Sequence, residues 1–197
     1  MDGEGVVVPR VGFMQGRLSP LVDGKIQAFP WRHWREEFAT ANRHGFEIME
    51  WTIDQERLNE NPLVTASGRA EIRRLSDEHD IRVESLTGDC FMQAPFYKSE
   101  GARRTALLAD FRAVLDGCLE IGVRHVVVPL VDNGRIEDRR QVDVLHAGLD
   151  SLRSMLRDGR ARIVFESDFD PPALAQFIAD FFPTSSVSTT TSATAPR

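Results

Sequence analysis

The sequence has only two cysteines among its 197 residues, Cys90 and Cys118, and they form neither a disulfide framework nor a CxxC pair. Such thiols are typical of reduced, buried side chains in a reducing compartment. No hydrophobic run approaches the length that spans a bilayer, and the N-terminal residues lack the basic and apolar regions of a secretory leader. These absences exclude a disulfide scaffold, predict no membrane partner and favour a cytoplasmic protein.

Positive charge is outnumbered by negative charge, with 24 Lys and Arg against 30 Asp and Glu and a net charge of −6. Nucleic acids and anionic membranes attract clustered Lys and Arg, so the composition argues against a nucleic-acid partner. The hydrophobic content of 42% is that of an ordinary soluble globular domain.

Four short β-branched or apolar runs, each ending on an acidic residue, are present instead. They are residues 46–50, 83–89, 126–132 and 163–166, ending on Glu50, Asp89, Asp132 and Glu166. Amphipathic helical segments separate the runs, which indicates parallel strands whose carboxyl ends lie at one rim. Taken alone, any one of these acids is better interpreted as a helix cap. The set of four favours a metal site or an acid–base site.

Hydrophobic periodicity predicts five strand–helix units. The expected strands are residues 11–14, 46–51, 82–86, 125–131 and 163–166, and the expected helices lie around residues 34–41, 72–79, 107–119, 145–156 and 174–181. Each unit has about the size of a barrel unit, but eight units need roughly 250 residues. A flavodoxin-like sheet would suit the length, but residues 15–20 are not its glycine-rich phosphate turn. We therefore predict an incomplete (β/α)8 TIM barrel with five to six units in residues 1–183.

Five segments along the chain carry a resemblance to a known family. They are GFMQGRLS at 12–19, FEIMEW at 46–51, SLTGDCFM at 85–92, VPLVDN at 128–133 and FES at 165–167. In this order they resemble the sugar phosphate isomerase/epimerases with the xylose-isomerase-like TIM barrel, relatives of the ketohexose 3-epimerases. The resemblance extends from about Gly12 to Phe182, and it is specific for the superfamily but not for a substrate.

The resemblance implies a divalent-metal-dependent isomerase or epimerase of a sugar or sugar phosphate, which transfers a proton through an enediolate. In the family, a Glu after strand five, an Asp after strand six, a His after strand seven and a Glu after strand eight hold the ion, usually Mn²⁺ or Mg²⁺. Glu166 matches the first of these, as metal ligand and as one of the two catalytic acid/base groups. The other ligands are missing from this chain. An acid near a helix N-terminus is the alternative interpretation of Glu166.

The resemblance also implies a set of residues that contact the sugar. They are Gln15, Arg17, Glu50, Trp51, Asp89 and Asp132. Trp51 would offer a flat apolar face to the sugar, and Arg17 would bind a phosphate through bidentate hydrogen bonds from its guanidinium. A packing role for Trp51, an ion pair for Arg17 and capping roles for the two aspartates remain open.

Two other functions are alternatives. An apurinic-site endonuclease of the same fold needs zinc-binding histidines at the strand ends, where this chain has Glu50-Trp51 and Gly88-Asp89-Cys90, and its charge is unsuited to DNA. A non-catalytic barrel fragment or pseudoenzyme that binds a sugar or a partner is the stronger alternative. Because a barrel without about three units leaves open sheet edges, we also expect poor solubility or association with another chain, including a homo-oligomer.

The composition changes abruptly at Thr184. Apart from Val187 and Arg197, residues 184–197 are only Ser, Thr, Ala and Pro, which predicts a disordered tail. We hypothesise that the tail from about Ser186 is an out-of-frame translation of strand six. A one-base shift allows the family pattern Gly-Val-Asn-Tyr-Asp-Ile-Gly-Asn-Ser-Ala at ten successive positions, with the metal-binding Asp at Thr191. The chain would then be nearly inactive, and the coding DNA beyond Pro183 tests the hypothesis.

Overall fold

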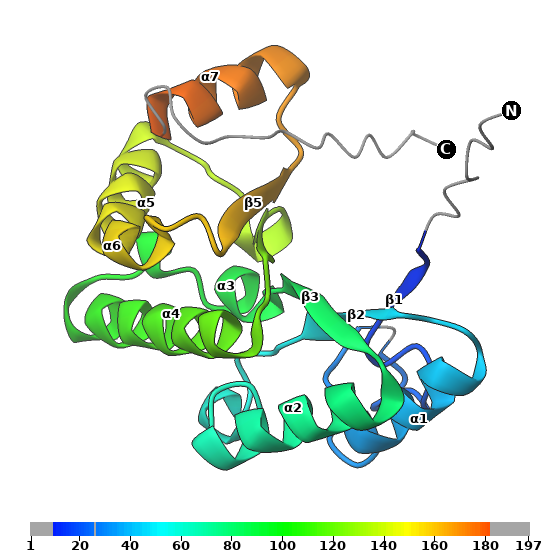
Figure 1. The fold of residues 1–197 in the computed structure, drawn as a ribbon. Helices are drawn as coiled ribbons and strands as arrows, with labels where there is room; N and C mark the ends of the chain where they lie inside the picture. The colour runs from blue at the N-terminus through cyan, green and yellow to red at the C-terminus, as the bar shows by residue number, and fades with distance from the viewer. Residues whose placement is uncertain (1–9, 26, 182–197) are drawn as a thin grey trace, which may run out of the picture.

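The computed structural model describes residues 10–25 and 27–181, and the strands in this part of the chain form one parallel sheet. The strands are β1 (Gly12–Met14), β2 (Ile48–Thr52), β3 (Arg82–Thr87), β4 (His125–Leu130) and β5 (Arg162–Ser167). Each strand pairs in parallel with the next one in the sequence (Figure 1). A doubly wound sheet would interrupt this order, so the predicted architecture of successive β-α units is confirmed.

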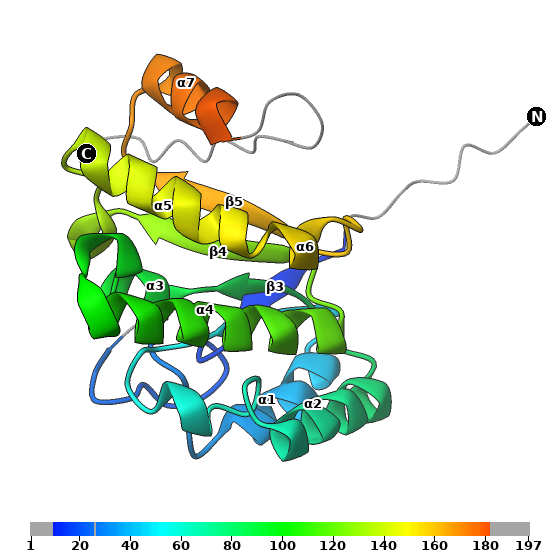
Figure 2. The same ribbon diagram turned by 90° about the vertical axis from the view of Figure 1, so that its left-hand side faces the viewer.

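Helices connect the strands along one side of the sheet. They are α1 (Trp34–Arg43), α2 (Ala66–His79), α3 (Asp89–Gln93), α4 (Gly101–Ile121), α5 (Arg139–Ser151), α6 (Arg153–Leu156) and α7 (Pro171–Phe181). Short 3₁₀ turns lie at Leu58–Glu60, Phe96–Lys98 and Asp132–Gly134. Figure 2 shows α4 and α5 running along the strands; α2 packs against α4, and α1 packs against α2. Within the described residues, no helix is long and apolar enough to cross a bilayer.

Local signals set the helix ends. The Thr65 hydroxyl accepts the Gly68 N–H at 3.2 Å to begin α2, and Gly122 ends α4 in the left-handed region at φ 91°. Residues 145–156, predicted as one helix, are divided at Leu152 into α5 and α6. The Leu152 N–H bonds to the Leu149 carbonyl, three residues back, which tightens the last turn of α5 and ends it. The predicted sixth unit and the tail at 184–197 lie outside the described residues.

The two faces of the sheet differ sharply in exposure. Side chains that point toward the helices are buried in the core, namely Met49, Trp51, Val83, Leu86, Val126, Val128 and Leu130. Most side chains on the opposite face, which would line the inside of a closed barrel, are only partly buried or exposed. We call this second face the inner face.

One irregularity sets which side chains of β3 reach the inner face. Met49 pairs with Val83, but Glu50 pairs with Ser85, so Glu84 is an extra residue in a β-bulge. After the bulge the alternation of β3 changes phase. Ser85 therefore lies on the same face as Glu50, although Val83 lies on the helix side.

Candidate active site at the carboxyl ends of the strands

The segment after β1 is held by buried hydrogen bonds. The Gln15 N–H donates to the Glu50 carbonyl at 2.9 Å, and its side-chain Oε1 accepts the Thr52 N–H at 3.2 Å. The Gln15 side chain is buried, and its Nε2 has no hydrogen-bond partner in the described part of the chain. Gln15 thus joins β1 to β2 at the rim, and Arg17, two residues later, is exposed beside it.

Glu37 of α1, which the sequence analysis did not single out, fixes the same segment. Its fully buried carboxylate accepts the Gly16 N–H on both oxygens at 2.9 Å, the Leu18 N–H at 3.1 Å and the Ser19 hydroxyl at 3.0 Å. Burial raises the pKa of Glu37 above its ordinary value, although the hydrogen bonds from Gly16, Ser19 and Leu18 act in the opposite direction. Glu37 is a positioning group for the loop that carries Arg17.

Glu50 lies on the inner face near the end of β2. It accepts the Ser85 hydroxyl at 2.8 Å and the Thr87 hydroxyl at 2.5 Å, both from β3. The bulge at Glu84 makes this pairing possible, because it brings both hydroxyls to the face of Glu50. The carboxylate is therefore held in one orientation across two strands.

The structure separates Trp51 from Glu50. Trp51 is fully buried on the helix side, where its ring packs 5.4 Å from Phe29 and 5.7 Å from Trp34 between centroids. Its indole N–H donates to Asn61 Oδ1 at 3.2 Å. Neighbouring residues of a strand point to opposite faces, so Trp51 packs in the core and does not lie beside Glu50 at the rim.

Asp89 is the most perturbed carboxyl of the rim. It follows β3, is 5% exposed, and accepts the Gln27 amide at 3.1 Å. Burial raises the pKa of Asp89 to about 6, the negative charges of Asp54, Glu166 and Glu50 add to the rise, and the hydrogen bond from Gln27 opposes it. The carboxylates that end different strands therefore act on one another electrostatically.

Asp54 belongs to this group although the sequence analysis did not single it out. It accepts the Phe29 N–H at 2.8 Å and the Gln93 amide at 2.8 Å, so it ties the loop after β1 to α3. Asp54 and Gln93 also line a pocket of about 300 Å³, together with Trp31 and Arg57. The sequence signal for Asp54 was its position, two residues after the end of β2.

The two remaining predicted residues follow β4 and end β5. Glu166 pairs in register with Pro129 and is exposed, and alternation along β5 puts it on the inner face with Val164. Asp132 is exposed at the start of the 3₁₀ turn after β4, with φ 48°. The structure links Glu50, Asp89 and Glu166 through their charges, and Asp132 stands apart at the end of β4.

The described residues offer a divalent metal ion too few ligands. Among residues 10–25 and 27–181, no three Asp, Glu, His or Cys side chains lie close enough together to hold an ion. The mutual repulsion at Asp89 would be relieved by a cation, but a structural or catalytic ion needs several ligands at once. The described residues therefore do not form a complete metal site on their own.

Solved structures match the fold. The chain aligns with a xylose isomerase domain protein from Planctomyces limnophilus at a TM-score of 0.55 and 12% identity, covering 74% of this chain and 54% of that chain. A D-allulose 3-epimerase from Methylomonas sp. aligns at 0.54 and 18% identity, with 75% and 52% covered. A xylose isomerase-like TIM barrel protein from Mycobacterium smegmatis, in complex with magnesium, aligns at 0.53 and 15% identity, with 80% and 56% covered.

This chain has the fold of the xylose-isomerase-like TIM barrels. No protein-family model matches the sequence, and no curated protein matches it at a significant level. The chain spans about half the length of the solved barrels that it matches. Five sequential parallel strands of an eight-stranded barrel explain that share, and the predicted incomplete TIM barrel is confirmed.

Proposed function

We propose that this partial barrel binds a small sugar or sugar phosphate at its carboxylate rim, as part of a sugar isomerase or epimerase. The observation that carries the proposal is the buried carboxyl of Asp89 at the rim, whose pKa is raised first by burial and further by the negative charges of Asp54, Glu166 and Glu50. A buried carboxyl group with a perturbed pKa, beside further carboxylates at the carboxyl rim of a barrel, is typical of an acid–base site.

The residues would have distinct roles. Glu50, fixed by Ser85 and Thr87, would accept a hydrogen bond from a sugar hydroxyl. Asp89, with a pKa of about 6, exists in both protonation states near neutral pH and would exchange a proton with the substrate. Glu166, exposed on the inner face, would be the second acid/base group of this wall.

Isomerisation or epimerisation also needs a group on the opposite side of the substrate, because the proton returns to another face or another carbon. The described residues supply one wall of the barrel. We therefore propose that this chain binds the sugar but turns it over poorly by itself. A divalent ion such as Mn²⁺ or Mg²⁺ would need ligands besides Glu166 and would polarise the sugar carbonyl.

Calorimetric titration with D-fructose, the sugar in one matching epimerase structure, tests the binding step. We expect a dissociation constant in the millimolar range, on the order of that for small polar ligands, and a loss of about tenfold in Asp89→Asn. The matched control is Asp143→Asn, which makes the same substitution at an exposed position of helix α5. Equal binding by both variants would contradict the proposed site.

A non-catalytic sugar-binding fragment is the second candidate, favoured by the incomplete metal site in the described residues. Titration with Mn²⁺ separates the two. Stoichiometric Mn²⁺ binding that Glu166→Gln removes, together with slow conversion of the sugar, favours the enzyme. Sugar binding without Mn²⁺ binding and without conversion favours the fragment.

A further inference from the structure

A pocket of about 560 Å³ lies at the N-terminal ends of β4 and β5, at the opposite end of the strands from the carboxylate rim. Four of its eight lining residues can carry positive charge, namely Arg124, His125, Arg160 and Arg162, and no carboxylate lines it. This concentration contrasts with the net charge of −6 on the whole chain. The pocket therefore has the charge expected of a site for an anion.

Two turns of similar construction form the walls of this pocket. One leads from α4 into β4 and the other from α6 into β5, and each contains a glycine with positive φ, Gly122 at 91° and Gly159 at 70°. A Cβ at either glycine would meet no atom within 4 Å, so both positions border open space. The Arg162 N–H donates to the Arg124 carbonyl at 2.8 Å, which joins the two turns. The pocket thus lies between two strands that pair with each other, and it does not depend on the open edges of the sheet.

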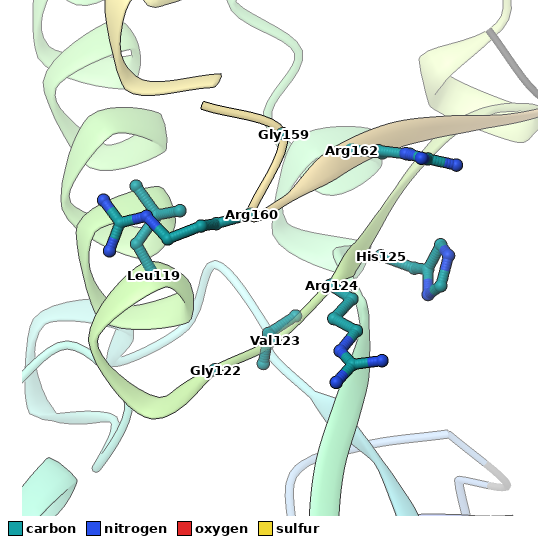
Figure 3. Close-up of a pocket in the computed structure, with 8 residues that line it drawn as sticks. All are labelled: Leu119, Gly122, Val123, Arg124, His125, Gly159, Arg160 and Arg162. Carbon is teal, nitrogen blue, oxygen red and sulfur yellow. The ribbon is translucent and has the colours of Figure 1, made fainter. Parts of the chain in front are cut away.

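Three of the four cationic side chains point away from the helices. Figure 3 shows the His125 ring and the Arg162 guanidinium on one side of the two strands, with the Arg124 guanidinium below the ring, whereas Arg160 extends toward Leu119. His125 and Arg162 are opposite each other in the strand register, and neighbouring strands are about 4.8 Å apart. A ligand between these two side chains would therefore contact both.

The positive charge of this group is not neutralised within the protein. Asp158, which is close in the sequence, pairs with Arg160. Within residues 10–25 and 27–181, no carboxylate pairs with Arg124 or Arg162, and both residues are exposed. Cationic side chains on adjacent strands repel one another, so a bound anion would relieve this repulsion.

We propose that this pocket binds the phosphate group of a small anionic ligand. A guanidinium donates two parallel hydrogen bonds to a phosphate, so Arg124 and Arg162 are suited to hold its oxygens, and His125 adds an imidazole N–H donor. The volume lies within the range of small-molecule sites, about 300–1,000 Å³. An organic group attached to the phosphate therefore has room, and Leu119 offers it an apolar contact.

The pocket is separate from the carboxylate rim. Glu166 follows Arg162 by four residues on β5, which is about 13 Å along an extended strand. Catalytic residues of TIM barrels lie at the C-terminal ends of the strands, whereas this pocket lies at the N-terminal ends. The phosphate ligand is therefore an effector or a stabilising ligand and not the reacting sugar, and its site does not rest on the proposed function.

Calorimetric titration at constant ionic strength, with inorganic phosphate and with phenyl phosphate, tests the site. We expect phenyl phosphate to bind with a dissociation constant on the order of 1 mM, and Arg124→Gln and Arg162→Gln each to weaken its binding about tenfold. Arg43→Gln removes the same charge from an exposed position of α1, so it is the control and should leave binding unchanged. Tighter binding of phenyl phosphate than of inorganic phosphate would identify a phosphate ester as the ligand, and equal binding would identify inorganic phosphate.

Two further measurements separate this pocket from the rim. Asp89→Asn should leave phenyl phosphate binding unchanged, and Arg162→Gln should leave D-fructose binding unchanged. Circular dichroism spectra identical to that of the natural chain show that each variant is folded. The proposal would be overturned if neither phosphate compound bound, if Arg43→Gln weakened binding as much as the two pocket variants, or if Asp89→Asn abolished it, because the last result would place the phosphate at the rim.

Discussion

The carboxylate of Glu37 accepts the backbone N–H of Gly16 on both of its oxygens, each at 2.9 Å. A buried helix residue thus fixes a loop 21 positions earlier in the chain. The arrangement gives the loop after β1 a defined position relative to the rim, and it makes that loop sensitive to a change at Glu37.

Glu37→Gln should lower the free energy of unfolding by about 2 kcal/mol, because an amide has one acceptor oxygen and would turn its NH₂ toward N–H donors. Urea denaturation at neutral pH measures the change. Glu36→Gln, the exposed neighbour that pairs with His33, should change it by less than about 0.5 kcal/mol. Equal effects of the two substitutions would contradict the positioning role of Glu37.

Asp89 should make the protein less stable as the pH rises from about 4 to about 6. Its pKa is about 6 when folded, above the ordinary 3.8, so the folded state binds more protons than the unfolded state in this window. Asp89→Asn should therefore raise stability at pH 7 by about 2 kcal/mol and have little effect at pH 4. Urea denaturation at both pH values gives the difference, and Asp132→Asn, exposed, should show no such dependence. A pH-independent effect of Asp89→Asn would contradict this account.

Trp51→Phe should destabilise the protein without weakening sugar binding per folded molecule. The substitution removes the indole N–H bond to Asn61 and part of the ring that contacts Phe29 and Trp34, which costs about 1–2 kcal/mol. Thermal denaturation and D-fructose titration measure the two quantities. Weaker sugar binding at unchanged stability would place Trp51 at the sugar site.

Gly122→Ala should lower the free energy of unfolding by about 1 kcal/mol, whereas Gly122→Asn should cost less, because asparagine tolerates the left-handed region better than alanine. Gly122 has φ 91°, and a Cβ placed there would meet no atom within 4 Å. The cost is therefore one of backbone conformation and not of crowding. If alanine and asparagine gave equal stability in urea denaturation, the left-handed ending of α4 would not be the cause.

Much of the architecture follows from periodicity in the sequence. The segments around Glu50, Asp89 and Glu166 were predicted to end parallel strands, and parallel connection then forces their carboxylates to one rim. Helix endings such as Gly122 were also visible in the sequence. These features depend on residues close together in the chain, where the physical rules are strongest.

Contacts between distant segments could not be predicted in the same way. Nothing near Glu37 in the sequence indicates that it binds the backbone of Gly16. By contrast, the separation of Trp51 from Glu50 was predictable, because adjacent residues of a strand cannot share a face. The expectation that both line one sugar pocket overlooked that alternation.

The extra residue Glu84 has a consequence for comparing this protein with others. A sequence alignment that treats β3 as a regular strand would shift Ser85 and Thr87 by one position and match them to side chains that face helices. A search for relatives with the same hydroxyl support for Glu50 therefore has to permit one inserted residue between Val83 and Ser85. Chains without that extra residue would have different side chains on the inner face of their third strand, even where the neighbouring residues of the strand are identical.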